Sequence, residues 1–218
     1  MTLDYKSLKE RQRAERANHP TNLALRVHRA LSWLDRAEQC DDQDGRFIFL
    51  WIAFNAAYAN ELGDRERIRA KQLFQVFLEK LAGLDKDGVL YALIWSEFPG
   101  SIRMLLDNRF VYQPFWDFHN GKTTEQEWKA GFDQARKTAN RALAGGATAS
   151  VLAIVLDRMY TLRNQLIHGG ATWNSRVNRD QLRDCTAFLG KLVPYVIQLM
   201  MDNPNTLWGD ACYPVVEN

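Results

Sequence analysis

The chain has 218 residues, which favours one domain and leaves two small domains as an alternative, because globular domains hold roughly 100–200 residues. Hydrophobic residues make up 46% of the chain and charged residues 25%, an ordinary balance for a soluble globular protein with a sizeable core. The net charge of +2, from 28 basic and 26 acidic residues, excludes a polycationic chain.

Apolar side chains at three- and four-residue spacing predict helices along most of the chain, and no alternating pattern predicts a strand. Five helical segments come first, at about 3–17, 21–40, 45–62, 65–82 and, irregularly, within 87–107. The third contains FIFLWIAFNAAYANEL, which is apolar on every side and therefore indicates a helix at the centre of a bundle.

Three further helical segments follow, at about 125–144, 149–168 and 179–202. Thr124 and Glu127 form a capping-box pattern that begins the first of them. Gly169 directly follows the second, which predicts a left-handed backbone that closes the helix. Asn178 is the expected N-cap of the third.

These segments predict an all-α fold, an antiparallel helical bundle with additions. The additions are an accessory basic helix at residues 1–20 and an irregular, aromatic-rich insertion at residues 87–120. Residues 203–218 are expected to be coil. Because no repeat or low-complexity linker interrupts the chain, the sequence predicts a single domain over residues 1–218.

Cysteine usage and hydropathy indicate the compartment. Cys40, Cys185 and Cys212 form no CxxC pair, which argues against a disulfide framework and a zinc site and favours a reducing cytoplasm. The longest uninterrupted apolar run, residues 47–54, is far shorter than the ~20 residues of a membrane span. The N-terminal stretch is charged, so we expect no signal peptide and no membrane as a partner.

The motifs of most enzyme classes are absent, among them the GxxxxGK phosphate loop, GxGxxG, GxSxG and HExxH. No histidine has a second His or Cys at three- or four-residue spacing. We therefore expect no metal site and no cofactor.

The segment 149–168 carries a polar anomaly near its end, because Arg163 falls within the apolar arc of the helix. A permanent cation there needs a partner or an open surface. In a structural interpretation, Arg163 extends past the end of the bundle and His168 bonds a carbonyl at the helix C-terminus. In a functional interpretation, Arg163 binds a phosphate, His168 transfers a proton and Asn164 orients the His168 ring.

The functional interpretation requires a second copy of the chain. Arg163 and His168 point about 140° apart on an ideal helix, so one helix does not bring them together. Two copies that meet across a two-fold axis place both Arg163 and both His168 side chains at one cleft, which predicts a homodimer.

The hexapeptide RNQLIH at residues 163–168 resembles the Arg-polar-x-x-x-His motif of the HEPN superfamily (higher eukaryote and prokaryote nucleotide-binding domains). The downstream sequence HGGATWNSRVNRD and the upstream helix FLWIAFNAAY resemble its bacterial Apea-like branch. The resemblance extends over about residues 45–200.

This resemblance implies a HEPN-like four-helix core, a homodimer and a metal-independent endoribonuclease that acts on RNA. Arg163, Asn164 and His168 carry over as the catalytic residues. The family analogy also implies a role in stress response or defence and an antitoxin or other protein as a partner. Some members are not catalytic, so the alternative function is a dimeric module that binds nucleic acid, a nucleotide or a partner protein.

Five more residues are candidate substrate contacts: Asn55, Tyr58, Trp173, Arg176 and Arg179. Asn55 is either a buried amide that bonds between helices or part of the site floor beside His168. Trp173 follows the motif directly and offers a ring on which a base can stack.

Basic charge and aromatic side chains are unevenly distributed. Residues 158–191 hold six Lys or Arg against two Asp, a net charge of +4 that suits a polyanion, although a solvated face gives the same pattern. The aromatic residues of 110–118 either stack single-stranded bases or form a satellite core.

Overall fold

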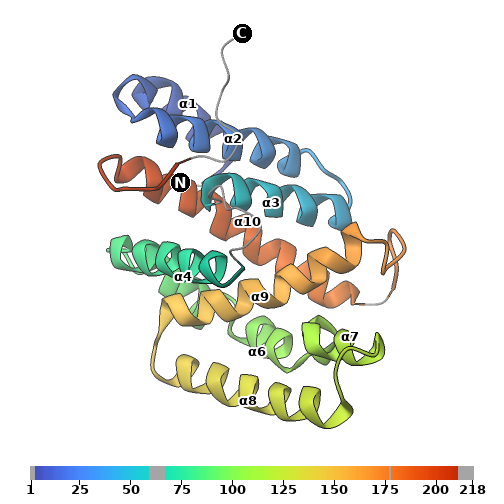
Figure 1. Cartoon of the computed structure of the whole chain (residues 1–218). Coiled ribbons are helices and arrows are strands. Elements are labelled where there is room, and N and C mark those ends of the chain that lie inside the picture. The colour runs from blue at the N-terminus through green and yellow to red at the C-terminus, as the bar shows by residue number, and fades with distance from the viewer. Residues whose placement is uncertain (1–2, 59–66, 177, 211–218) are drawn as a thin grey trace. The chain divides into compact units, whose positions relative to one another are not determined.

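The computed structural model of the chain describes residues 3–58, 67–176 and 178–210, and only the backbone of residues 67–71 (Figure 1). Every regular element within these residues is a helix, which confirms the predicted all-α fold. The predicted helical residues 59–62, 65 and 66 and the predicted coil at 211–218 lie outside the described residues. Residues 203–210 contain no helix, as expected.

The chain divides into two compact units, one of residues 1–85 with 186–218 and one of residues 86–185. Compact units of one chain are not the same as independently folding domains. The predicted single domain over residues 1–218 therefore stays a prediction.

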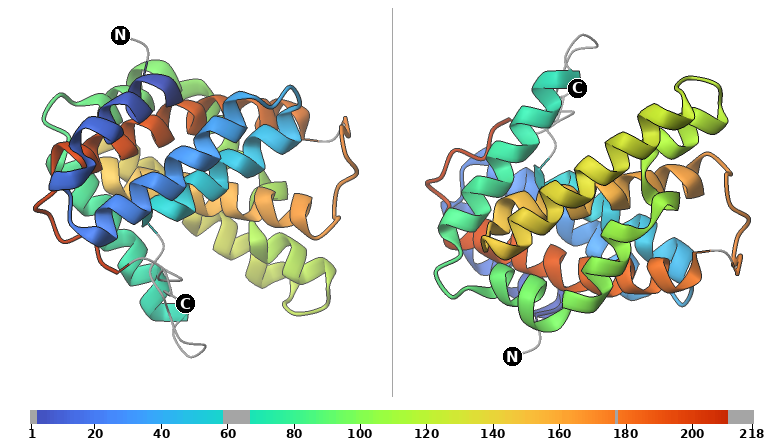
Figure 2. Two further views of the ribbon diagram at one scale, coloured as in Figure 1. Left: turned by 90° about the horizontal axis from the view of Figure 1, so that it is seen from above. Right: turned by 90° about the horizontal axis from the view of Figure 1, so that it is seen from below.

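The first unit contains the N-terminal helices and the C-terminal part of the last one. Its elements are α1 (Tyr5–Glu15), the 3₁₀ turn η1 (Arg16–Asn18), α2 (Thr21–Glu38), α3 (Gln43–Tyr58), α4 (Arg67–Leu84) and α10 (Arg179–Asp202) from Thr186 onward. Figures 1 and 2 show α2 and α3 side by side. The accessory basic helix expected at residues 1–20 is α1, which packs on α2.

The core of the first unit follows the predicted apolar stripe. Val27, Leu31 and Leu34 of α2 are buried, as are Phe47 and Phe54 of α3, because the two helices face each other along their lengths. Burial of side chains of this size removes on the order of 1.5–3 kcal/mol of unfavourable hydration each.

The second unit contains shorter elements and two long helices. They are α5 (Val89–Ala92), the π-helical turn η2 (Leu93–Glu97), α6 (Pro99–Asp107), the 3₁₀ turn η3 (Arg109–Val111), α7 (Gln113–His119), α8 (Glu125–Ala144), α9 (Thr148–Ile167) and the start of α10. The predicted irregular insertion at 87–120 is thus a series of short helical pieces from α5 to α7.

The long helix α9 packs against α6 and α8, and its buried face forms the core of this unit. Leu152, Leu156 and Met159 are each at most 1% exposed. The capping box that begins α8 is confirmed, because the Thr124 hydroxyl accepts from the Glu127 backbone N–H and the Glu127 carboxylate accepts from the Thr124 N–H. Within the described residues, no helix combines the length and hydropathy needed to cross a bilayer.

Candidate functional site

The C-terminal end of α9 is closed by a glycine, as the sequence predicts. His168 is the C-cap, and Gly169 has a φ of 70°. The N–H of Gly170 donates to the carbonyl of Gln165 at 2.7 Å, and the N–H of Gly169 donates to that of Leu166 at 3.3 Å. These two bonds form a Schellman motif, which ends the helix and fixes the backbone beneath His168.

Arg163 is half-buried one turn before this end, and no carboxylate neutralises it within the described part of the chain. Its Nη1 donates to the Asn164 Oδ1 at 2.9 Å, and its guanidinium carbon lies 5.9 Å from the centre of the Tyr160 ring. Its buried Nε has no acceptor among the described residues. Because no described carboxylate neutralises it, this half-buried guanidinium keeps donors for an anionic ligand.

Asn164 contacts Arg163 rather than His168. Its amide oxygen accepts the Arg163 hydrogen bond, and no hydrogen bond joins the Asn164 and His168 side chains in the described structure. The predicted orientation of the His168 ring by Asn164 is therefore not observed. Asn164 instead orients the guanidinium.

The His168 ring is exposed and makes no hydrogen bond with any described residue. Only its backbone is held, because its N–H donates to the Asn164 carbonyl at 3.0 Å. His168 thus lies at the end of α9 with its ring accessible to a ligand.

The loop after His168 presents an aromatic ring and a cation. Trp173 is 74% exposed, and Arg176 is exposed without a polar partner among the described residues. Arg179 is less free, since its Nε donates to the Ser175 carbonyl at 2.8 Å. The expected N-cap of α10, Asn178, has a φ of 57°, and its carbonyl accepts from the Leu182 N–H.

Asn55 and Tyr58 belong to α3 in the first unit, so the structure does not bring them together with the α9 residues in one unit. Tyr58 packs in an aromatic cluster, with its ring centre 4.9 Å from that of Phe74 and 5.2 Å from that of Phe54. The Asn55 amide is half-buried and makes no side-chain hydrogen bond to a described residue. Its place in a site floor stays a prediction.

Outside the hexapeptide motif, three of the four arginines in the expected basic rim at residues 158–191 contact other groups in the described structure. Arg158 is only 3% exposed, and its guanidinium lies 4.4 Å from the Tyr112 ring centre and 5.8 Å from that of Phe132. Burial lowers the pKa of this guanidinium, although neighbouring Asp157 opposes the shift. Arg183 is ion-paired with two aspartates.

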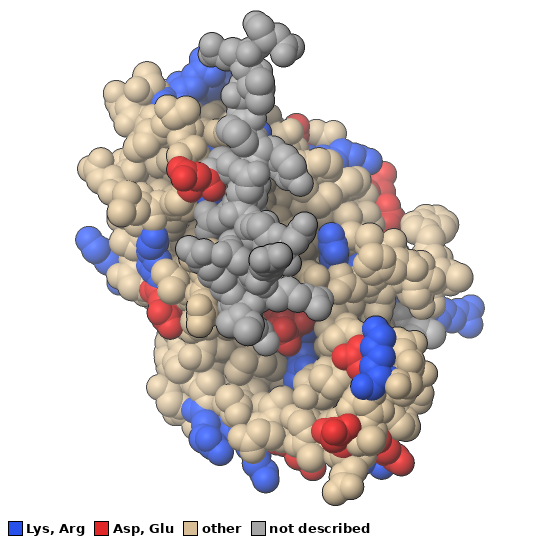
Figure 3. Space-filling view, viewed as in Figure 1, with Lys and Arg blue, Asp and Glu red and all other residues tan. Residues whose placement is uncertain are grey.

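Figure 3 shows basic and acidic side chains interspersed over one face. Arg176 remains as an exposed cation next to the motif.

The aromatic segment 110–118 is mainly a satellite core. Phe115 is buried and its ring meets those of Trp116 and Trp128 edge to face, each at 5.2 Å. Phe110 is the exception, since this residue is 39% exposed. The Phe110 carbonyl accepts from the Gln165 Nε2 at 2.6 Å, which attaches the segment to α9 within the RNQLIH motif. Sequence reasoning missed Gln165, which occupies an unspecified position of the motif.

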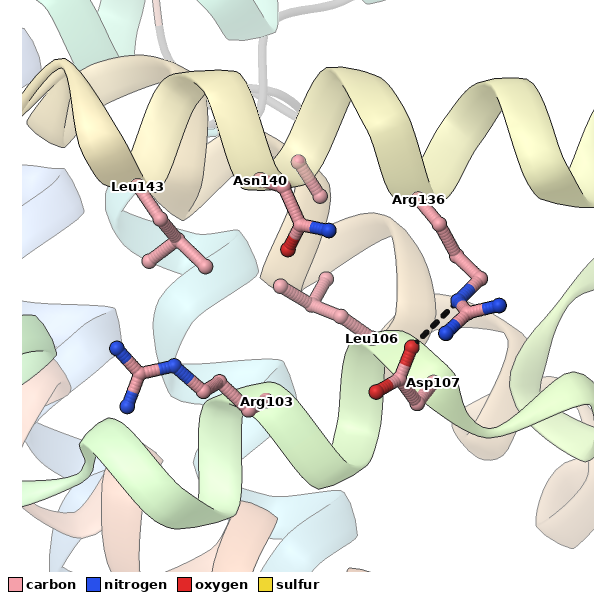
Figure 4. Close-up of a pocket in the computed structure, with 7 residues that line it drawn as sticks. Arg103, Leu106, Asp107, Arg136, Asn140 and Leu143 are labelled. Carbon is pink, nitrogen blue, oxygen red and sulfur yellow. Dashed lines mark hydrogen bonds and ion pairs between the residues drawn. The ribbon is translucent and has the colours of Figure 1, made fainter.

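A pocket of about 60 Å³ lies between α6 and α8 of the second unit (Figure 4). The pocket is lined by Arg103, Leu106, Asp107, Arg136, Ala139, Asn140 and Leu143. Arg136 donates to Asp107 at 2.6 Å, whereas Arg103 is exposed without a polar partner among the described residues. No histidine, cysteine or hydroxyl lines this pocket, and neither does any residue of the α9 motif. It offers contacts for an anion but no group for proton transfer near neutral pH.

No protein-family model matches the chain, and neither a curated protein nor a solved structure matches it. The HEPN resemblance therefore rests on the sequence motifs, and the activity that it implies stays a hypothesis.

Proposed function

We propose that the chain is a HEPN-type, metal-independent endoribonuclease with Arg163, Asn164 and His168 at its site. One observation carries the proposal: Arg163 has no carboxylate partner within the described residues, is oriented by Asn164, and lies on the same helix end as an exposed His168. A cation of this kind and an accessible imidazole, brought together by two copies of the chain, suit a phosphate that undergoes acid–base chemistry.

The proposed site is composite and forms between two copies of the chain. Tyr160 and Ile167, three residues before and four residues after Arg163, are 48% and 46% exposed on α9. Along the helix, these two apolar residues flank Arg163, and a second copy of the chain would cover them. Such a dimer also solves the divergence of Arg163 and His168, because each copy supplies both residues to the shared cleft.

In the proposed reaction, the ribose 2′-oxygen attacks the adjacent phosphorus and the bond from phosphorus to the 5′-oxygen breaks. His168 accepts the 2′-hydroxyl proton, and His168 of the partner subunit donates a proton to the departing 5′-oxygen. Arg163 stabilises the charge that develops on the phosphate oxygens. The products are a 2′,3′-cyclic phosphate and a 5′-hydroxyl end.

The test is cleavage of end-labelled RNAs by the full chain in EDTA. General acid–base catalysis contributes roughly 10²–10⁴-fold, so His168→Ala should lower the rate by that order. Arg163→Ala should weaken both binding and turnover, and Arg163→Lys should restore only part because an ammonium lacks the planar fork. Arg103→Ala and His28→Ala, which remove the same side-chain types elsewhere, should cleave as wild type does.

The competing function is a non-catalytic dimeric binding module. It predicts no wild-type cleavage of any RNA tested, a lower melting temperature for Arg163→Ala and no change for His168→Ala. Light scattering that shows a monomer at micromolar concentration would contradict the composite site. A role in stress response or defence, with an antitoxin or another protein partner, belongs to the same proposal.

A further inference from the structure

The η3 turn holds an exposed aromatic ring on a rigid backbone. The Phe110 N–H donates to the Asn108 Oδ1 at 2.9 Å, and the Phe110 carbonyl accepts from the Trp116 Nε1 at 2.8 Å and from the Gln165 Nε2. The neighbouring Val111 is fully buried. The backbone of Phe110 is therefore held at both its N–H and its carbonyl, while the residue is 39% exposed.

A cation accompanies this ring. The guanidinium carbon of Arg109 lies 5.1 Å from the Phe110 ring centre and 5.6 Å from that of Phe115. Arg109 is exposed and forms no ion pair with a described carboxylate. The guanidinium thus lies over one face of the Phe110 ring and leaves the opposite face for a base. An aromatic ring with a planar cation is a combination that binds bases and phosphates of single-stranded nucleic acid.

The turn is attached to the His168 side of α9. Gln165, which bonds the Phe110 carbonyl, precedes His168 by three residues, and side chains at this spacing are neighbours on a helix. On an ideal helix the two directions differ by about 60°, whereas Arg163 points about 160° away from Gln165. The Phe110 turn therefore flanks His168 rather than Arg163.

We propose that Arg109 and Phe110 form a base-stacking subsite for single-stranded nucleic acid that passes the His168 end of α9. The base rests on the Phe110 ring, and the Arg109 guanidinium contacts the adjoining phosphate. The choice of RNA as the nucleic acid rests on the proposed function. The subsite itself rests on the exposed ring, its cation and the hydrogen bond from Gln165.

The experiment measures fluorescence anisotropy of a labelled single-stranded oligouridylate with the full-length His168→Ala protein, so that cleavage does not interfere. Adding Phe110→Ala should weaken binding about 5-fold or more, the lower end of the loss expected for one stacked base. Phe110→Leu, which keeps an apolar side chain and tests the ring if the alanine variant is misfolded, should show most of the same loss. Met104→Ala, another exposed apolar residue of the second unit, should bind unchanged.

Two further measurements separate stacking from charge. An abasic strand of equal length should bind the Phe110→Ala and parent proteins equally, because it offers no base. Arg109→Gln should reduce the slope of log affinity against log salt by about one, whereas Phe110→Ala should leave that slope unchanged.

The inference is overturned if the oligouridylate does not bind, if Phe110→Ala binds it as the parent does, or if the loss is equal on the abasic strand. Each result is independent of catalysis. If the wild-type chain cleaves no RNA but binding depends on Phe110, the ribonuclease proposal is contradicted and the subsite remains supported. Cleavage of RNA that does not depend on Phe110, with binding that does not depend on it either, contradicts the subsite and leaves the ribonuclease proposal intact.

Discussion

Replacement of Gly169 by alanine tests whether the end of α9 requires a left-handed residue. Gly169 has a φ of 70°, and a Cβ built there meets no atom within 4 Å. The substitution therefore introduces backbone strain without a steric clash against neighbouring groups. His168 is the adjacent C-cap, so relief of the strain would move the backbone that carries the proposed catalytic imidazole.

The magnitude follows from the backbone alone. A left-handed conformation costs an L-residue about 1–2 kcal/mol, and a domain of this size loses roughly 2–4 °C of melting temperature per kcal/mol. Gly169→Ala should therefore melt about 2–8 °C below wild type. The melting temperature of Gly169→Asn should lie between those of wild type and Gly169→Ala, because asparagine tolerates the left-handed conformation better than alanine does.

Gly100→Ala provides the matched control in the same unit. A Cβ at Gly100 also meets nothing within 4 Å, but its φ is not in the left-handed region. The control should be neutral or more stable by about 0.4–1 kcal/mol, because alanine reduces the entropy of the unfolded chain. Differential scanning calorimetry of Gly169→Ala, Gly169→Asn and Gly100→Ala measures the order of their melting temperatures. Equal melting temperatures for Gly169→Ala and Gly100→Ala would refute the assignment of Gly169 as a required left-handed cap.

Three other predictions concern pH and packing. Hydrogen bonds of the α8 capping box lower the pKa of Glu127 to about 2, so its stabilising contribution is complete above its ordinary pKa of 4.5 and disappears as pH falls towards 2. The melting temperature of Glu127→Gln should accordingly approach that of wild type as pH falls from 5 to 2, and a constant difference would contradict this. Leu156→Ala should cost about 2–5 kcal/mol in urea unfolding, whereas the 86% exposed Leu207→Ala should stay within about 0.5 kcal/mol. Gly131→Ala places a Cβ 2.9 Å from the Tyr112 hydroxyl and should cost about 1–3 kcal/mol, and a double mutant with Tyr112→Phe should recover part of that loss in the same urea assay.

The sequence by itself determined the long helices α8 and α9 and their ends. The segment expected at 125–144 is α8, Glu125–Ala144, and its capping box is present. The segment expected at 149–168 is α9, Thr148–Ile167, closed by a left-handed Gly169. These features are local, because periodicity, caps and glycine stops act over a few residues and remain visible in a linear chain.

Only the tertiary structure decided which polar side chains are available. The sequence placed Arg158 in a basic rim, whereas the rings of Tyr112 and Phe132 enclose it. It left the aromatic segment undecided, and the bond from Gln165 to the Phe110 carbonyl, across 55 residues, attaches that segment to α9. Helical periodicity gives the direction of each side chain but not the neighbour it meets, since that neighbour comes from a distant part of the chain that only packing brings close.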